Sequence, residues 1–131
     1  LTISKFDFDM TPPEAAAILY PKISEIVGKV DVYGEKKVES TNKAFKFLDF
    51  VLEKINSSKD DVDAALRAAV AGNVIDFATE VTFDIKDEIE TIFEAKFAID
   101  HKPIFKEKLK TAKSLMVIGD NVGEHVFDKI M

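Results

Sequence analysis

The chain ends with Ser114-Leu-Met-Val-Ile-Gly-Asp-Asn-Val-Gly-Glu-His-Val-Phe-Asp-Lys-Ile-Met131, and this stretch sets the expected fold class. Leu115–Ile118 is a short apolar run with β-branched residues that stops at Gly119, which predicts a buried β-strand. Asn121 can cap a helix, because apolar residues recur after it at helical spacing. The ending therefore predicts a strand that runs into a helix.

The junction of these two elements, Gly119-Asp120-Asn121, is the first candidate site. In an open parallel α/β sheet, ligands bind outside the carboxyl ends of the strands. Asp120 and Asn121 offer hard oxygen ligands suited to Mg²⁺ or Mn²⁺, and a helix N-terminus behind them favours an anion such as phosphate. A simple capped helix start is the structural alternative. Glu124 can support the metal ligands from behind, act as a general acid or base, or simply complement the helix dipole.

Composition narrows the class of protein. The 131 residues, of which 47% are hydrophobic and 32% charged, suffice for one folded domain. A net charge of −6 without a basic cluster argues against a nucleic-acid partner. No apolar run approaches the roughly 20 residues of a membrane span, and the absence of cysteine excludes disulfides and thiolate metal sites within this segment. We expect a cytoplasmic protein without a membrane partner.

Most of the chain before the final stretch has helical patterns. A helix starts at Thr11-Pro-Pro-Glu14, which combines an N-cap with a capping box, and can end at Gly28. Pro21 is expected to kink this helix or divide it in two. Further helices are predicted at about 35–56, from 58 or 60 to Gly72, from 84 or 87, and from Pro103 to about 112. The predicted fold is mainly α, with a helical domain over residues 1–112. Residues 113–131 are predicted to begin an α/β metal-binding domain.

A lone strand at 115–118 leaves its backbone donors and acceptors unpaired. Its neighbours must come from residues after Met131 or from another chain. We expect the remainder of the α/β domain to lie beyond this segment, and Leu1, which is not an initiator methionine, to follow a missing start.

The second candidate motif is Gly72-Asn-Val-Ile-Asp76, which interrupts the preceding helical pattern. Asn73 and Asp76 share a face if the segment is helical, so they can orient a ligand or hold a helix break. Taken alone, the motif favours the break. Arg67 is the only arginine and hence the only candidate for bidentate phosphate recognition, although such a residue is commonly a surface side chain with a packed stem.

Taken together, these motifs resemble those of a known family. Thr11-Pro-Pro-Glu14, Asp31-Val-Tyr-Gly-Glu-Lys36, Arg67 with Gly72-Asn-Val-Ile-Asp76, and Gly119-Asp-Asn-Val-Gly-Glu124 occur in the order seen in the damage-control phosphatases. These are metal-dependent phosphatases formerly grouped as domain of unknown function 89. The chain looks most similar to their archaeal branch, as an N-terminal-to-middle fragment.

The resemblance implies a helical region followed by a Rossmann-like α/β domain that hydrolyses phosphate esters of small metabolites such as sugar phosphates. It implies a divalent cation (Mn²⁺, Co²⁺, Ni²⁺ or Mg²⁺) on Asp120 and Asn121, with a third ligand beyond Met131. Asp120 and Glu124 would be catalytic, and Asn73, Asp76 and Arg67 would line the substrate site. We expect residues 1–131 alone to be inactive.

Two other classes of function stay open at this point. Another group-transfer enzyme could use the same strand-end crevice, although the chain has no G-x-G-x-x-G loop. A non-catalytic helical interaction module could instead use the apolar helix faces as a partner groove.

Overall fold

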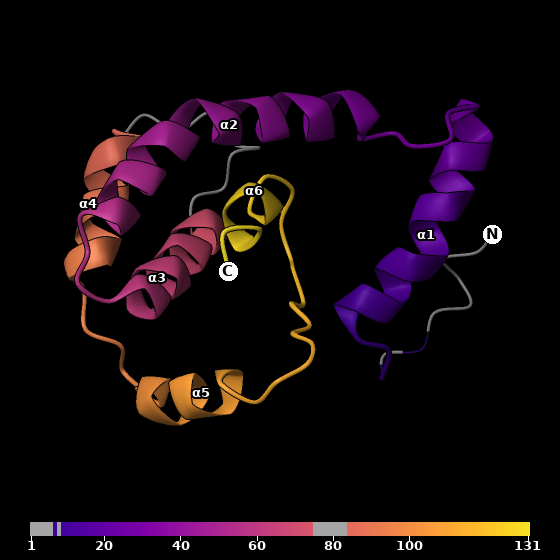
Figure 1. Cartoon of the computed structure of the whole chain (residues 1–131). Helices are drawn as coiled ribbons and strands as arrows, with labels where there is room; N and C mark the ends of the chain where they lie inside the picture. Colours follow the sequence, from indigo (N-terminus) through magenta and orange to yellow (C-terminus); the bar gives the residue numbers. More distant parts are fainter. Residues whose placement is uncertain (1–6, 8, 75–83) are drawn as a thin grey trace. The chain divides into compact units, whose positions relative to one another are not determined.

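The computed structural model describes residues 7, 9–74 and 84–131 (Figure 1). The chain divides into two compact units, Leu1–Glu35 and Lys36–Met131. Residues 113–131 belong to the second unit together with most of the helical region. The predicted boundary between residues 112 and 113 stays a prediction about a longer protein.

The first unit contains α1 (Pro12–Val27). The backbone N–H of Thr11 donates to the Glu14 carboxylate at 2.8 Å, and the Thr11 hydroxyl donates to the same oxygen at 2.7 Å. The helix ends at Gly28, whose φ of 72° is the left-handed conformation that glycine adopts without strain. The start and the end predicted for this helix are therefore confirmed. The division expected at Pro21 is not found, because the helix is continuous through this residue.

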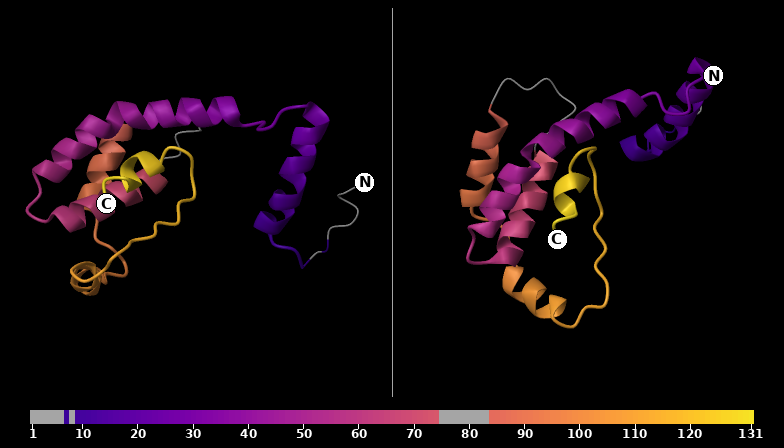
Figure 2. Two further views of the ribbon diagram at one scale, coloured as in Figure 1. Left: turned by 45° about the vertical axis from the view of Figure 1, so that its right-hand side comes forward. Right: turned by 45° about the horizontal axis from the view of Figure 1, so that its top comes forward.

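The second unit contains the remaining helices (Figures 1 and 2). Their bounds are α2 (Gly34–Asn56, of which Lys36 onward lies in this unit), α3 (Asp61–Val74), α4 (Ile85–Glu94), α5 (Lys102–Leu109) and α6 (His125–Asp128). The helices predicted at 35–56, after residue 84 and at Pro103 are confirmed within a few residues. Asp84 caps α4 by accepting a hydrogen bond from the backbone N–H of Lys86 at 2.9 Å.

The core forms where α3 packs against α4 and α6, with the apolar face of α2 joining them. The core residues are Ala44, Val51, Ala68, Ala71, Ile89, Val126 and Phe127. On α3 the buried side chains are alanines, whereas the larger Val62 and Leu66, which the helical pattern places on the apolar face, are only half-buried. Small side chains allow the helices to approach closely, so packing distance rather than side-chain size decides which face of α3 is buried.

Ion pairs connect α5 to the start of α3. Lys102 donates to Asp63, and Lys106 donates to Asp60. Burial opposes ionisation of Asp63, but hydrogen bonds from Lys102 and Arg67 outweigh it and lower the pKa of this carboxyl. The acidic start of α3 is therefore held in its charged form by basic side chains.

The predicted strand is not formed. Within the described residues no strand is present, and Leu115, Met116, Val117 and Ile118 are 46%, 82%, 48% and 87% exposed. The described residues offer this segment no neighbouring strand, so its backbone has nothing to pair with in a sheet. The segment is instead an extended connection between α5 and α6.

The helix predicted to follow an N-cap at Asn121 begins three residues later than expected. Residues 121–124 form a bend and turn, Gly123 has a φ of 103°, and α6 starts only at His125. A left-handed glycine interrupts a right-handed helix. The helix N-terminus that was expected to favour phosphate beside Asn121 is consequently absent there.

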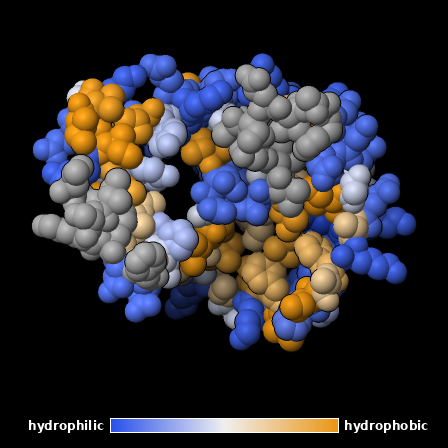
Figure 3. All heavy atoms as spheres, turned by 180° about the vertical axis from the view of Figure 1, so that it is seen from behind, coloured by the Kyte–Doolittle hydropathy of each residue, from blue (hydrophilic) through white to orange (hydrophobic). Residues whose placement is uncertain are grey.

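Apolar side chains also reach the surface, as the orange areas of Figure 3 show on the back of the molecule. Among the residues that the structure describes, no helix has the length and apolar character that crossing a bilayer requires.

Candidate functional site

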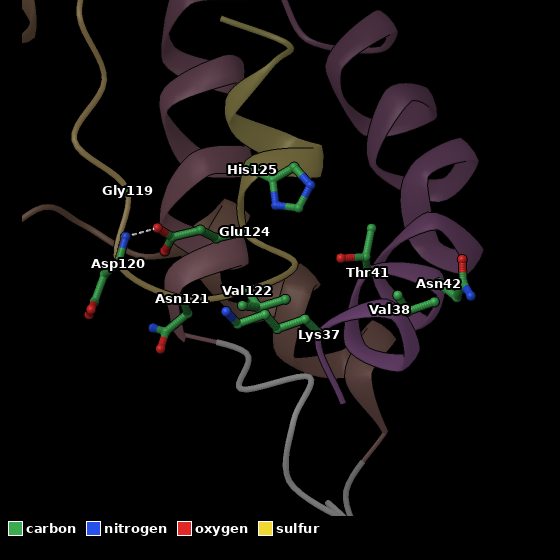
Figure 4. Close-up of a pocket in the computed structure, with 10 residues that line it drawn as sticks. All are labelled: Lys37, Val38, Thr41, Asn42, Gly119, Asp120, Asn121, Val122, Glu124 and His125. Carbon is green, nitrogen blue, oxygen red and sulfur yellow. Dashed lines mark hydrogen bonds between the residues drawn. The ribbon is translucent and has the colours of Figure 1, made fainter. Parts of the chain in front are cut away.

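The two motifs singled out in the sequence meet in the structure. Asn73 lies near the end of α3, and its side-chain amide donates to one Glu124 carboxylate oxygen at 2.8 Å. The backbone N–H of Asp120 donates to the other carboxylate oxygen of Glu124 (Figure 4). Glu124 is only 3% exposed. A buried carboxylate therefore joins α3 to the turn that carries Asp120.

Two glycines make this close approach possible. A Cβ atom at Gly72 would lie 3.1 Å from the Glu124 Cα atom and 3.0 Å from the Phe127 ring. A Cβ atom at Gly119 would lie 2.8 Å from a Glu124 carboxylate oxygen. Gly72 does not break the helix, because α3 continues to Val74. It is the point where α3 contacts the final turn.

A pocket of about 460 Å³ opens over the Asp120 turn. The first half of α2 forms one wall, with Lys37, Val38, Thr41 and Asn42, and the turn and α6 form the rest (Figure 4). The remaining lining residues are Gly119, Asp120, Asn121, Val122, Glu124 and His125. Its volume is in the range of small-ligand sites.

Asp120 and Asn121 present exposed side chains at this pocket. Figure 4 shows both side chains extending away from Glu124. Within the described residues the hydrogen bonding of Asp120 uses its backbone N–H, which leaves the carboxylate available. The carboxylate and amide oxygens suit a hard divalent cation in kind. In number they fall short, because no group of three His, Cys, Asp or Glu ligands exists in the described part of the chain.

A second carboxylate, Asp128, lies near the same turn. A Cβ atom at Gly119 would be 3.8 Å from an Asp128 carboxylate oxygen. Burial, followed by the negative charge of Glu124, raises the pKa of Asp128 above its ordinary value, while His125 acts in the opposite direction. Negative charge is therefore concentrated beneath the Asp120 turn.

Two predicted site residues that the structure describes, Arg67 and Asn73, do not line this pocket, although Asn73 contacts Glu124, which does. Arg67 donates to Asp63 at 2.7 Å and to the backbone carbonyls of Ile92 and Ala95 at 2.9 and 2.6 Å. Its guanidinium is thus used to fix the end of α4 against α3. Asp76 lies outside the described residues.

The wall from α2 was missed by sequence reasoning. Lys37 and Thr41 are one helical turn apart, as are Val38 and Asn42, so the four share a face of α2. The sequence contains only a weak signal for this wall, because Val38 is a single apolar residue within a charged run. In the structure Val38 is exposed. These residues are about 80 positions from Asp120, and only the fold places them beside it.

The fold and the site together define a helical domain with an acidic, oxygen-rich turn at a small pocket. Comparison with known proteins identifies the class of protein to which this domain belongs. Residues 2–131 match the damage-control phosphatase ARMT1-like domain. The chain belongs to this family, as its motifs had indicated.

Relatives of the chain are archaeal. It is 31% identical over its full length to a damage-control phosphatase of Pyrococcus horikoshii, of which it covers 45%. It is 32% identical to an uncharacterized protein of Methanocaldococcus jannaschii (92% of this chain, 41% of the relative) and 25% identical to a damage-control phosphatase of Archaeoglobus fulgidus (88% and 41%). The chain thus spans less than half the length of these relatives. No solved structure matches it.

Proposed function

We propose that this chain supplies the helical domain and part of the metal site of a phosphatase that hydrolyses phosphate esters of small metabolites, sugar phosphates among them. The observation that carries the proposal is the pocket in which Asp120 and Asn121 face polar groups of α2. Membership of the damage-control phosphatase family supports it. The Rossmann-like continuation of the chain and the third metal ligand are part of the proposal.

In this proposal Asp120 and Asn121 hold a divalent cation, either Mn²⁺, Co²⁺, Ni²⁺ or Mg²⁺. Mg²⁺ commonly uses one or two protein carboxylates together with waters and substrate phosphate, so a small number of protein ligands is compatible with it. Such an ion, when bound, would polarise the phosphoryl group and neutralise its charge. In hydrolysis, water attacks phosphorus, the bond from phosphorus to the ester oxygen breaks, and the alcohol leaves with a proton from water.

The wall from α2 would hold the substrate opposite the cation. Lys37 offers a positive charge, and Thr41 and Asn42 offer a hydroxyl and an amide that can bind phosphate or sugar hydroxyl groups. Val38 and Val122 add apolar surface. The pocket therefore fits a small, hydroxylated phosphate ester in both size and chemistry.

The test uses the full-length protein with an aryl phosphate as general substrate and a titration of MnCl₂. Asp120→Ala should lower metal-dependent phosphate release by about 100-fold or more, because it removes a ligand of the catalytic ion. Its melting temperature without metal should not fall, since the carboxylate is exposed. Asp49→Ala is the control, because it removes an exposed carboxylate of α2 that does not line the pocket. Wild-type turnover in Asp120→Ala would reject the site, and no phosphatase activity in the parent protein would favour the group-transfer or interaction-module alternatives.

A further inference from the structure

We infer that Glu124 and Asn73 are positioning residues, which hold the Asp120-Asn121 turn in its metal-binding geometry, and that Glu124 is not the general acid or base. The inference rests on the proposed function of Asp120 and Asn121. It assigns a separate task to buried Glu124 and to Asn73, which donates a hydrogen bond to it.

Both oxygens of the Glu124 carboxylate accept hydrogen bonds. One oxygen accepts from the backbone N–H of Asp120, and the other accepts from the Asn73 amide at 2.8 Å. Glu124 lines the pocket but is only 3% exposed. A general acid or base must reach the proton that it transfers. Both oxygens of Glu124 instead face the protein.

The Glu124 carboxylate connects a helix of the core to the turn that carries Asp120. Asn73 is on α3, which contributes Ala68 and Ala71 to the core. Asp120 belongs to a turn that precedes α6 and has no regular secondary structure. The contact through Glu124 therefore ties a turn to a packed helix. Groups that orient metal ligands in this way are commonly worth tenfold to 100-fold in metal affinity.

Two glycines leave space for Glu124. Gly119 leaves room for a Glu124 oxygen where a Cβ atom would come within 2.8 Å of it, and Gly72 leaves room for the Glu124 backbone. The glycines at positions 72 and 119 thus both leave room for one residue, Glu124. Within the described residues every buried side-chain polar atom has a partner, so a variant that removes one partner leaves another unsatisfied.

This arrangement permits an experiment in which the hydrogen bond is reversed. Asn73→Asp alone places a second carboxylate against Glu124, so the two repel each other. Asn73→Asp combined with Glu124→Gln exchanges donor and acceptor: the new amide can donate to position 73, and its oxygen can still accept from the Asp120 N–H. Exposed Glu53→Gln on α2 is the matched control for loss of a carboxylate.

Two readouts should be measured in the full-length protein: Mn²⁺ affinity by calorimetry, and hydrogen exchange of the Asp120 amide without metal. We expect Asn73→Asp to weaken Mn²⁺ binding about tenfold or more and to accelerate exchange by a similar factor. The double variant should return both values to within about threefold of the parent, whereas Glu53→Gln should change neither. Parent-like Mn²⁺ affinity and amide protection in Asn73→Asp, or a double variant that binds Mn²⁺ more weakly than Asn73→Asp, would overturn the inference.

The exchange measurement separates this inference from the proposed function. If the parent protein bound no metal and released no phosphate, the proposed function would fail. Protection of the Asp120 amide and its rescue in the double variant would then still show that Glu124 holds the turn. If metal binding and activity were present but the amide were unprotected in the parent, the positioning role alone would be rejected.

Discussion

Gly72 lies directly against Phe127: a Cβ atom at this glycine would be 3.0 Å from Cδ2 of the phenylalanine ring. Phe127 is fully buried, and the backbone of Glu124 approaches Gly72 from the same side. Neither neighbour can move without disturbing the core or the turn above it. This contact explains why a glycine is found inside a continuous helix.

Gly72→Ala should therefore destabilise the protein by about 1 kcal/mol. Overpacking of this kind costs roughly 1–3 kcal/mol of stability. The higher helix propensity of alanine offsets about 1 kcal/mol of this cost. Urea unfolding measures the difference. Gly34→Ala is the control, because a Cβ atom there would meet nothing closer than 3.9 Å and should be neutral or stabilising. Equal stability of the two variants would show that the ring adjusts freely.

Lys37→Gln should raise KM for a phosphate ester about fivefold to tenfold and leave kcat nearly unchanged. Lys37 is proposed to contact the substrate from α2, and an interaction equal in the ground and transition states affects KM alone. Steady-state kinetics with an aryl phosphate would test this. Lys46→Gln, an exposed lysine on the same helix that does not line the pocket, is the control for charge. An equal rise in KM for both variants would indicate a general effect of charge instead.

Asp63→Asn should reduce stability at neutral pH by about 1.5–3 kcal/mol, because Lys102 and Arg67 both donate to this carboxylate. The folded-state pKa of Asp63 is lowered from 3.8. The contribution of Asp63 to folding stability is therefore complete above pH 3.8. It is lost as the pH falls through the lowered folded-state pKa. Melting temperatures between pH 2 and pH 7 should show a shallower acid dependence in the variant than in the parent. Parallel pH profiles would contradict this assignment.

Asp128→Asn should have the opposite effect and raise stability at neutral pH, by about 1 kcal/mol or less. The folded-state pKa of Asp128 is raised by burial and by Glu124. Protonation of such a group favours the folded state, so its stabilising contribution is present at low pH and is lost as the pH rises through the raised value. The amide variant avoids the charge at all pH values. Thermal unfolding at pH 4 and pH 7 should give a gain only at the higher pH.

Local signals predicted the helices well. Thr11 with Glu14 and Asp84 with the N–H of Lys86 are caps made within one helical turn, so the sequence alone contains both partners. The face of α2 that carries Ala44 and Val51 also follows from helical spacing. Such elements depend on neighbours in the chain, and prediction from sequence succeeds there.

Long-range contacts explain what could not be predicted. Gly72 has the sequence signature of a helix break, and only the approach of Phe127 shows that it serves close packing. The same holds for Lys37 and Thr41, whose place beside Asp120 depends on the packing of α2. Leu115–Ile118 has the composition of a strand, but a strand requires a partner as well as a pattern. The described residues contain no such partner.

The hydrogen bond from Asn73 to Glu124 joins residues that are 51 positions apart, and this has a consequence for the order of folding. Closing so long a loop costs entropy that must be offset before the contact forms, whereas α2, α3 and α4 follow one another along the chain. We expect the helices to associate first and the Asp120 turn to dock last. Substitutions at Asn73 or Glu124 should then accelerate unfolding much more than they slow refolding, so the pocket would be the first part of the domain to open.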